Sequence, residues 1–319
     1  MDVVYGRNQV ARNMTAFSPS AFKPKRLAEY LHRCGLSVTL HDPVKLSRKQ
    51  LALAHDPEYV DGVLDLKIDN GFRNTDSEVA ASLPYTSGSL YRACELALTN
   101  SVKMAASFTS GFHHARYNDG GGFCTFNGLV VAAQLLKQAG KIKTVLILDC
   151  DEHYGDGTDQ IIKHLELDYI RHATFGGCNF APRTSGLQNV RLLEKAIRKN
   201  FQAHTANPIK TKGDYYLEEL KRIMTLLQVH PVDLVIYQAG ADVHVNDPLG
   251  GTLTTEEMAQ RDRMVFQACH QLQIPLAWNL AGGYNVREEF EHGSIEHLLP
   301  VLDLHKQTYE IGEEIYYGH

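Results

Sequence analysis

One short segment of the chain joins a buried strand to a cluster of acidic and histidine side chains. The strand is the apolar, β-branched run Thr144–Leu148, and the residues Asp149-Cys150-Asp151-Glu152-His153-Tyr154-Gly155-Asp156-Gly157 follow it directly. Alternation along an extended chain places Asp149, Asp151 and His153 on one face. Charged groups at the end of a buried strand are costly unless they bind something, and open α/β sheets bind ligands at that end. The segment therefore predicts half of a metal site in a parallel sheet.

The rest of the chain alternates between strand-like and helix-like patterns. We expect further strands at Val3–Tyr5, Lys103–Thr109, Asp233–Tyr237 and Pro275–Leu280. We expect helices at Pro24–Cys34, Gly88–Leu98, Asn127–Ala139 and Tyr215–Leu227, one from Gly157, and one from Thr254 or Thr255 to about Gln271. Repeated β-then-α units predict a parallel sheet with helices on both faces. Without repeats, low-complexity tracts or a long linker, residues 1–319 are expected to form one domain.

Composition excludes several classes of function. The 44% hydrophobic and 22% charged content is ordinary for a globular protein. A formal net charge of −5 argues against direct nucleic-acid binding and against an anionic membrane surface. No signal-peptide pattern and no apolar run of about 20 residues is present, so we expect no membrane span. The six cysteines form no Cys-x-x-Cys pair, which favours reduced thiols and a cytoplasmic location.

Four expected strand ends carry polar clusters. They are Gly111-Phe112-His113-His114-Ala115, Asp149–Gly157, Gly240-Ala241-Asp242 with Asp247-Pro248-Leu249-Gly250-Gly251, and Ala281-Gly282-Gly283-Tyr284. Four clusters at the same kind of position in one sheet are expected to converge. The glycines are not a phosphate loop or a dinucleotide fingerprint, because the required Lys-Ser/Thr and Gly-x-Gly-x-x-Gly patterns are missing. No serine lies in a Gly-x-Ser-x-Gly elbow, so a serine hydrolase is disfavoured.

The clusters contain a complete set of groups for metal-assisted hydrolysis. We take Asp151, His153 and Asp242 as the ligands, a set that suits zinc or ferrous iron and leaves coordination positions open. Such a metal lowers the pKa of bound water and polarises a carbonyl.

Proton transfer is assigned to the tandem His113-His114. Asp149 and Asp156 are the candidate carboxylates behind the two imidazoles, where they would fix each tautomer. Tyr284, on a glycine turn, would donate its hydroxyl to the developing oxyanion.

These blocks, in this order, resemble the histone deacetylase superfamily. The matching segments also include Gly121-Gly122-Phe123-Cys124-x-x-Asn127 and Gly282-Gly283-Tyr284-Asn285, and the resemblance runs from Phe17–Leu31 to Asn285. It leans toward class IV and bacterial deacetylase-like amidohydrolases. The resemblance implies the arginase-deacetylase fold, a three-layer α/β/α sandwich around a mostly parallel sheet of about eight strands.

The resemblance also implies a role for each matching residue. Asp151, His153 and Asp242 match the zinc ligands. His114 with Asp156 matches the general base and acid, His113 with Asp149 the electrostatic catalyst, and Tyr284 the carbonyl-polarising tyrosine. Gly122 and Phe123 match the tunnel that grips an acyl-lysine stem. Asp149, with the backbone carbonyls of Asp151 and His153, is expected to hold a structural potassium ion, with further ligands around His172–Thr174, and Arg26 matches an arginine near the internal acetate exit channel.

The chain departs from the family pattern in two places. Tyr154 stands where many members have a second histidine, but that position is outside the ligand set. The region from Cys178 to about Asn207 lacks the usual glycine-rich pattern, so one wall of the pocket mouth is not predicted. The basic stretch Arg183–Lys212 is interpreted as a solvated helix face in preference to a loop that steers an acidic substrate.

We therefore expect a zinc-dependent amidohydrolase that removes an acyl group, most often acetyl, from lysine side chains of a protein or peptide, or from small N-acylated amines. Acetylpolyamine and long-chain acyl-lysine substrates stay open, and a homo-oligomer is compatible with the sequence. A non-catalytic acyl-lysine binder would have lost a ligand or the tyrosine. A two-manganese ureohydrolase would need an Asp-Ala-His-x-Asp pattern, which is absent.

Overall fold

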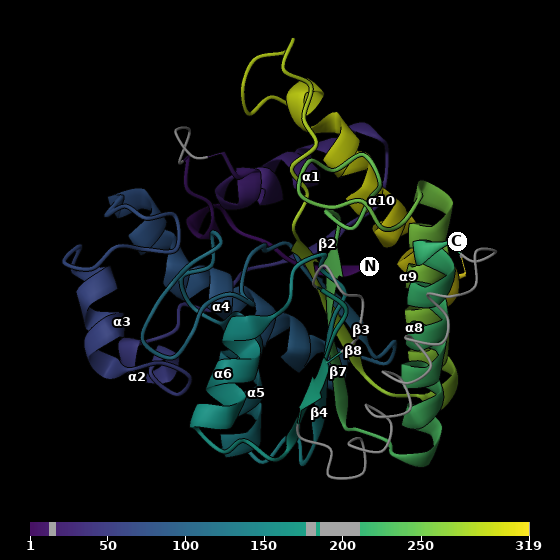
Figure 1. Ribbon diagram of the computed structural model, residues 1–319, viewed down its shortest axis with the longest axis horizontal. Coiled ribbons are helices and arrows are strands. Elements are labelled where there is room, and N and C mark those ends of the chain that lie inside the picture. The colour runs from purple at the N-terminus through teal and green to yellow at the C-terminus, as the bar shows by residue number, and fades with distance from the viewer. Residues whose placement is uncertain (13–16, 177–182, 186–210, 319) are drawn as a thin grey trace.

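The described part of the chain is built around one eight-stranded sheet. The computed structural model describes residues 1–12, 17–176, 183–185 and 211–318 (Figure 1). The strand order is β2-β1-β3-β8-β7-β4-β5-β6, and every pairing is parallel except that of β5 with β6. The strands are β1 (Asp2–Val4), β2 (Thr39–His41), β3 (Met104–Ser107), β4 (Val145–Asp149), β5 (Ile170–Thr174), β6 (Arg183–Ser185), β7 (Leu234–Gly240) and β8 (Leu276–Ala281).

Helices cover both faces of this sheet, so the expected three-layer α/β/α fold is confirmed (Figure 1). One face packs against α1 (Lys23–Arg33), α8 (Lys212–Val229), α9 (Thr255–Leu272) and α10 (Ile295–Tyr317). The other packs against α2 (Arg48–Leu51), α3 (Pro57–Leu64), α4 (Ser77–Thr99), α5 (Gly128–Gln138) and α6 (Asp156–His164). Two short 3-10 helices, Arg7–Gln9 and Pro19–Ala21, precede α1.

The two cores follow from the period of two in the strand sequences. In β4, Leu146 and Leu148 belong to the core beneath α8 and α9, whereas Val145 and Ile147 belong to the core beneath α4 and α5. Because a central strand is buried on both faces, it reads as a continuous apolar run, and that run is what the sequence displays. The apolar pattern therefore specifies both the strand and its place at the middle of the sheet.

The sheet order sets the position of the functional residues. In the sheet, β8 and β7 lie between β3 and β4, although β3 and β4 are consecutive in sequence. The carboxyl ends of these four strands therefore meet where the winding direction of the chain changes. All four polar clusters follow these strands. Their convergence at one edge of the sheet is thus a consequence of topology.

Some expectations fall outside what the structure describes. Cys178, most of the basic stretch Arg183–Lys212 and most of the mouth region 178–207 lie outside the described residues. Among the described helices, none has the length and apolar character that crossing a bilayer requires.

Candidate active site

Three predicted metal ligands lie at the ends of two adjacent strands. Asp151 and His153 follow β4, and Asp242 follows β7. One ligand atom from each lies within 4.8 Å of the others. The Nδ1 atom of His153 is 3.2 Å from Oδ1 of Asp151 and 3.0 Å from Oδ2 of Asp242. The structure therefore brings together two residues close in sequence and a third about ninety residues downstream.

The electrostatics of this cluster favour a cation. Asp151 and Asp242 are both buried, and burial together with the neighbouring Asp151 raises the pKa of Asp242 to about 7. Burial alone would also raise the pKa of Asp151, but His113 and His153 outweigh it and hold that pKa below its ordinary value. Two buried carboxylates and one imidazole nitrogen converge here and form a donor set that fits zinc or ferrous iron.

His113 lies in the buried part of the site. Its Nδ1 is 2.8 Å from Oδ2 of Asp149, and its Nε2 is 3.7 Å from Oδ1 of Asp151. Asp149 also accepts a hydrogen bond from Nε2 of Gln238 at 2.9 Å. Burial alone would lower the pKa of His113, but the carboxylates of Asp149 and Asp151 raise it to about 9. These two carboxylates therefore favour the protonated form of His113.

His114 differs from its neighbour in charge. Its Nδ1 lies 2.6 Å from Oδ1 of Asp156, and the guanidinium of Arg116 binds the other carboxylate oxygen at 2.6 Å. Burial and the positive charge of His113, whose ring centroid is 4.1 Å away, lower the pKa of His114 despite Asp156. A carboxylate only accepts hydrogen bonds, so Nδ1 carries the hydrogen and Nε2 is free to take a proton. Its ring centroid lies 6.0 Å from that of His153.

Tyr284 follows β8 on a turn made by Gly282 and Gly283, whose φ values are +44° and +91°. Its ring lies between two others: Phe17 is stacked on it at 5.8 Å and Phe123 is tilted against it at 5.9 Å. Burial raises its pKa well above the ordinary value, so the hydroxyl stays protonated and can donate.

Gly122 and Phe123 form a wall beside His114. The φ of Gly122 is +52°, and a Cβ atom there would collide with the imidazole ring of His114. Phe123 itself has a φ of +64°, a conformation that costs a non-glycine residue energy. Its ring contacts Phe72 at 5.7 Å as well as Tyr284. An aromatic arc of Phe72, Phe123, Tyr284 and Phe17 thus flanks the site.

The residues around the expected potassium site include a buried histidine, His172. Neither of its ring nitrogens has a hydrogen-bond partner among the residues that the structure describes. Thr174 Oγ1 accepts from the backbone N–H of Gly155 at 3.1 Å. A Cβ on Gly155 would lie 2.5 Å from Oδ2 of Asp149 and 3.2 Å from Nε2 of His172, so these groups border one space. Potassium binding there stays a prediction.

Arg26 makes its contacts away from the cluster. Its guanidinium donates to the carbonyl of Gly293 and, at 2.7 Å, to Glu29. Lys23, at the first position of α1, is a fully buried cation beside the cluster, and its Nζ donates to the carbonyl of Gly282. The acetate-channel role of Arg26 stays a prediction.

Sequence reasoning missed Lys23, Phe17 and Arg116. Phe17 and Lys23 lie in a segment matched only by general resemblance, and nothing local marks either one. Arg116 directly follows the His113-His114-Ala115 block, and its proximity to that block was the one signal available.

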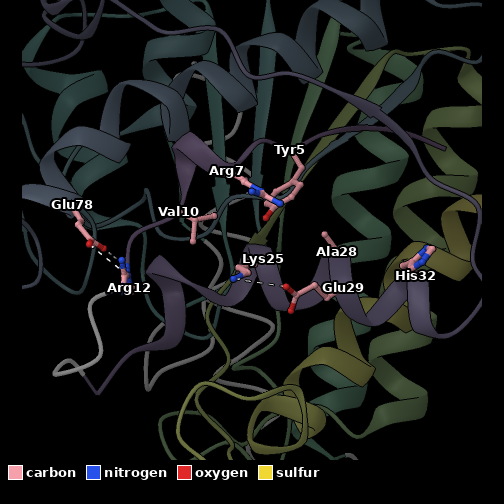
Figure 2. A pocket seen from close by; sticks show the side chains of 9 residues that line it. All are labelled: Tyr5, Arg7, Val10, Arg12, Lys25, Ala28, Glu29, His32 and Glu78. Atoms are coloured by element: carbon pink, nitrogen blue, oxygen red, sulfur yellow. Dashed lines mark hydrogen bonds and ion pairs between the residues drawn. The ribbon is translucent and has the colours of Figure 1, made fainter.

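A separate groove of about 890 Å3 lies between the 3-10 helix Arg7–Gln9 and α1 (Figure 2). The ion pairs of Arg12 with Glu78 and of Lys25 with Glu29 lie along it. None of its nine lining residues belongs to the cluster described above.

Comparisons with known proteins show the family of this chain. A family model described as the histone deacetylase domain matches residues 20–298. An uncharacterized protein of Picosynechococcus sp. is 29% identical over 77% of this chain and 78% of its own length. Histone deacetylase 15 of Arabidopsis thaliana is 28% identical over 76% of this chain, which spans only 45% of that relative.

Two solved structures share the fold. The deacetylase domain described as HDA15 HD gives a TM-score of 0.72 at 18% identity, covering 99% of this chain and 89% of that chain. Acetylpolyamine aminohydrolase from Burkholderia pseudomallei gives 0.68 at 16% identity, covering 99% of both chains.

Proposed function

Since this chain belongs to the histone deacetylase family, we propose that it is a metal-dependent amidohydrolase that removes an acyl group, most often acetyl, from lysine side chains or related N-acylated amines. One observation carries the proposal. Two histidine–carboxylate pairs of different charge, the Asp151, His153 and Asp242 cluster and Tyr284 all lie at the carboxyl ends of β3, β4, β7 and β8.

Asp151, His153 and Asp242 would hold the metal, with zinc as the expected ion and ferrous iron as an alternative. When bound, the metal would lower the pKa of a water molecule and polarise the acyl carbonyl. Asp149 lies just behind the cluster and, with the backbone around Asp151 and His153, is also the proposed potassium site.

His114 moves the proton. Its free Nε2 accepts a proton from the attacking water, because its lowered pKa keeps it neutral at neutral pH. Asp156 holds the Nδ1 hydrogen throughout and stabilises the imidazolium that forms. The same Nε2 then gives its proton to the leaving amine nitrogen, which restores neutral His114.

His113 and Tyr284 stabilise the charge that develops. Asp149 favours the protonated form of His113, which would place a positive charge next to the reacting atoms. The Tyr284 hydroxyl, protonated because of burial, donates to the carbonyl oxygen as it becomes an oxyanion. Gly122 and Phe123 line the path of the substrate stem, where glycine lets the backbone approach His114.

We further propose that residues 1–319 act as one catalytic domain. Elements from β1 to α10 contribute to one sheet or to the helices packed on it. The sister substrates of the family, acetylated polyamines and longer acyl-lysines, remain alternatives for the same chemistry.

Two substitutions test the mechanism. His114→Ala and Tyr284→Phe are expected to lower kcat on a fluorogenic acetyl-lysine peptide by about a hundredfold or more, because each removes a proton carrier or an oxyanion donor. His230→Ala, on an exposed histidine, is the control and should keep full turnover. The fold is checked by the fluorescence of the buried Trp278.

Full activity in either variant would reject the assigned roles.

Turnover and metal analysis distinguish the alternative functions. A protein that binds acetyl-lysine peptide without turnover is a binder, and two metals per chain would favour a ureohydrolase.

A further inference from the structure

The turn that carries Tyr284 is pressed against a candidate metal ligand. Gly282 has a φ of +44°, and a Cβ atom there would overlap the carboxylate of Asp242. A Cβ on Gly283 would lie 2.6 Å from Val301, so the turn has the Asp242 carboxylate on one side and a side chain of α10 on the other. The position of the turn thus decides both where Tyr284 points and how Asp242 is oriented.

A carboxylate from the loop after β7 holds one side of this turn. Oδ2 of Asp247 accepts hydrogen bonds from the backbone N–H groups of Tyr284 at 2.7 Å and Asn285 at 3.2 Å. Its other oxygen accepts from Leu249 at 3.0 Å. Asp247 is only 6% exposed, and three backbone donors satisfy its charge.

A lysine from α1 holds the other side. Nζ of Lys23 donates to the carbonyl oxygen of Gly282, and the residue is fully buried. The signs of the two groups match the peptide groups they bind, since the cation contacts a C=O and the anion contacts N–H groups. Lys23 also interacts electrostatically with Asp242, Asp151 and Asp247.

The tyrosine ring has no comparable anchor of its own. No hydrogen bond of the Tyr284 hydroxyl is found among the described residues, and its aromatic neighbours are the apolar rings of Phe17 and Phe123. Neither of these rings offers the hydroxyl a polar partner, and Phe17 is 61% exposed. The direction of the hydroxyl therefore depends on the backbone of the turn.

We propose that Lys23 and Asp247 are positioning residues that clamp the Gly282–Asn285 turn from two sides and so aim the Tyr284 hydroxyl at the substrate carbonyl. A charged group is expensive to bury, and the cost is offset here by contacts to a single turn. The catalytic part of this inference rests on the proposed amidohydrolase function, whereas the clamp itself is a property of the fold.

The first test measures the clamp without any substrate. Amide hydrogen exchange of Tyr284 and Asn285 is compared in the wild type, Lys23→Met and Asp247→Ala. Exchange at these two amides is expected to quicken by about tenfold or more in both variants, while β8 amides such as Trp278 keep their rates. Unchanged exchange at Tyr284 and Asn285 in both would overturn the clamp, whatever the enzyme does.

The second test is a double-mutant cycle on acetyl-lysine peptide. Lys23→Met should lower kcat by about tenfold with KM changed less than about twofold, because the lost interaction serves the transition state. In a Tyr284→Phe background the same change should cost less than about twofold, because no hydroxyl is left to aim. Asp247→Asn, which keeps one acceptor oxygen, should lose less than Asp247→Ala.

Lys25→Met is the matched control, an exposed lysine two positions along the same helix, and should change neither readout. Equal losses from Lys23→Met with and without the tyrosine hydroxyl would overturn the positioning role. A wild-type chain without turnover would reject the proposed function while leaving the exchange result to decide the clamp.

Discussion

At the scale of single residues, the two adjacent histidines acquire different charges from their neighbours. Asp149 is hydrogen-bonded to His113 and to the neutral amide of Gln238, and the pKa of His113 rises to about 9. Asp156 is shared between His114 and Arg116, and although burial opposes it, these two partners lower the pKa of Asp156 to about 2. By pairing with Asp156, Arg116 weakens the effect of that carboxylate in raising the pKa of His114.

This sharing predicts a shift in pH dependence. Arg116→Gln should raise the pKa of His114, since it removes a nearby cation and leaves Asp156 to that imidazole alone. His114 must be neutral to accept a proton, so the acid limb of kcat/KM should move to higher pH by about half a unit. Rate profiles from pH 5 to 9 would measure it.

Removing the carboxylate of Asp156 should shift the acid limb of kcat/KM in the opposite direction. Asp156→Asn removes the anion that favours the imidazolium, so the acid limb should move to lower pH while kcat falls. Arg48→Gln is the control, because Arg48 also pairs with carboxylates but with Asp61 and Asp65. An acid limb that stays fixed in Arg116→Gln would show that another group controls it.

At the scale of elements, glycines set how closely one loop approaches another. Gly282 and Gly140 both have positive φ, but only Gly282 faces a functional group, and no atom lies within 4 Å of a Cβ built at Gly140. Alanine substitutions at Gly282 and Gly140 therefore distinguish the effect of backbone strain, which both share, from displacement of the site, which only Gly282→Ala causes.

Gly282→Ala is expected to lose metal affinity, since its Cβ would push the carboxylate of Asp242 aside. Gly140→Ala should cost about 1 kcal/mol of folding free energy through the same positive φ and keep its metal. Metal titration by calorimetry, with a thermal melt of each metal-free variant, would check both. Equal metal affinity in the two alanine variants would contradict the contact.

The sequence predicted the strands whose side chains are buried on both faces of the sheet. β4, β7 and β8 are buried on both faces and appear as apolar runs, so their positions were predicted to within one to three residues. β5 was missed because Arg171 and His172 interrupt its apolar character, although it pairs with β4 throughout. The helix α10, with Pro300 inside, was also missed.

The site residues could be listed from sequence because motif blocks mark them, but their partners could not. Asp247 was visible as part of Asp247-Pro248-Leu249-Gly250, yet nothing in the sequence says that its carboxylate binds the Tyr284 turn. Lys23 is separated from Gly282 by 259 positions. Such contacts depend on the packing of α1 against the sheet, which local patterns do not encode.

At the scale of the whole molecule, the sheet order forces acidic groups into the interior. Arg261 of α9, fully buried, donates to the carbonyl of Gly240 at 2.6 Å and to that of Cys150 at 3.4 Å, and so links the two strands that carry the ligands. The fold thus holds Asp151 and Asp242 side by side through contacts of the chain itself. Such a preformed site should destabilise the metal-free protein.

This cost can be measured with Asp242→Asn in the metal-free protein. The folded-state pKa of Asp242 is raised from its ordinary value to about 7, so its contribution to stability is present at about pH 4 and lost as pH rises through about 7. Asparagine does not ionise, so the variant escapes this loss. The free energy of unfolding of Asp242→Asn should exceed that of wild type by an amount that grows from about pH 4 and levels off above about pH 7. The difference should reach on the order of 2 kcal/mol.

Zinc should reverse the order of stability. Wild type gains stability by binding the ion in the folded state only, whereas Asp242→Asn has lost a charged ligand and gains less. Chemical denaturation at pH 4.5 and pH 8, with chelator and with zinc, gives the four free energies of unfolding needed for each protein. If the metal-free variant were no more stable than wild type at pH 8, ionisation of the buried Asp242 carboxylate would not cost the stability that its raised pKa indicates.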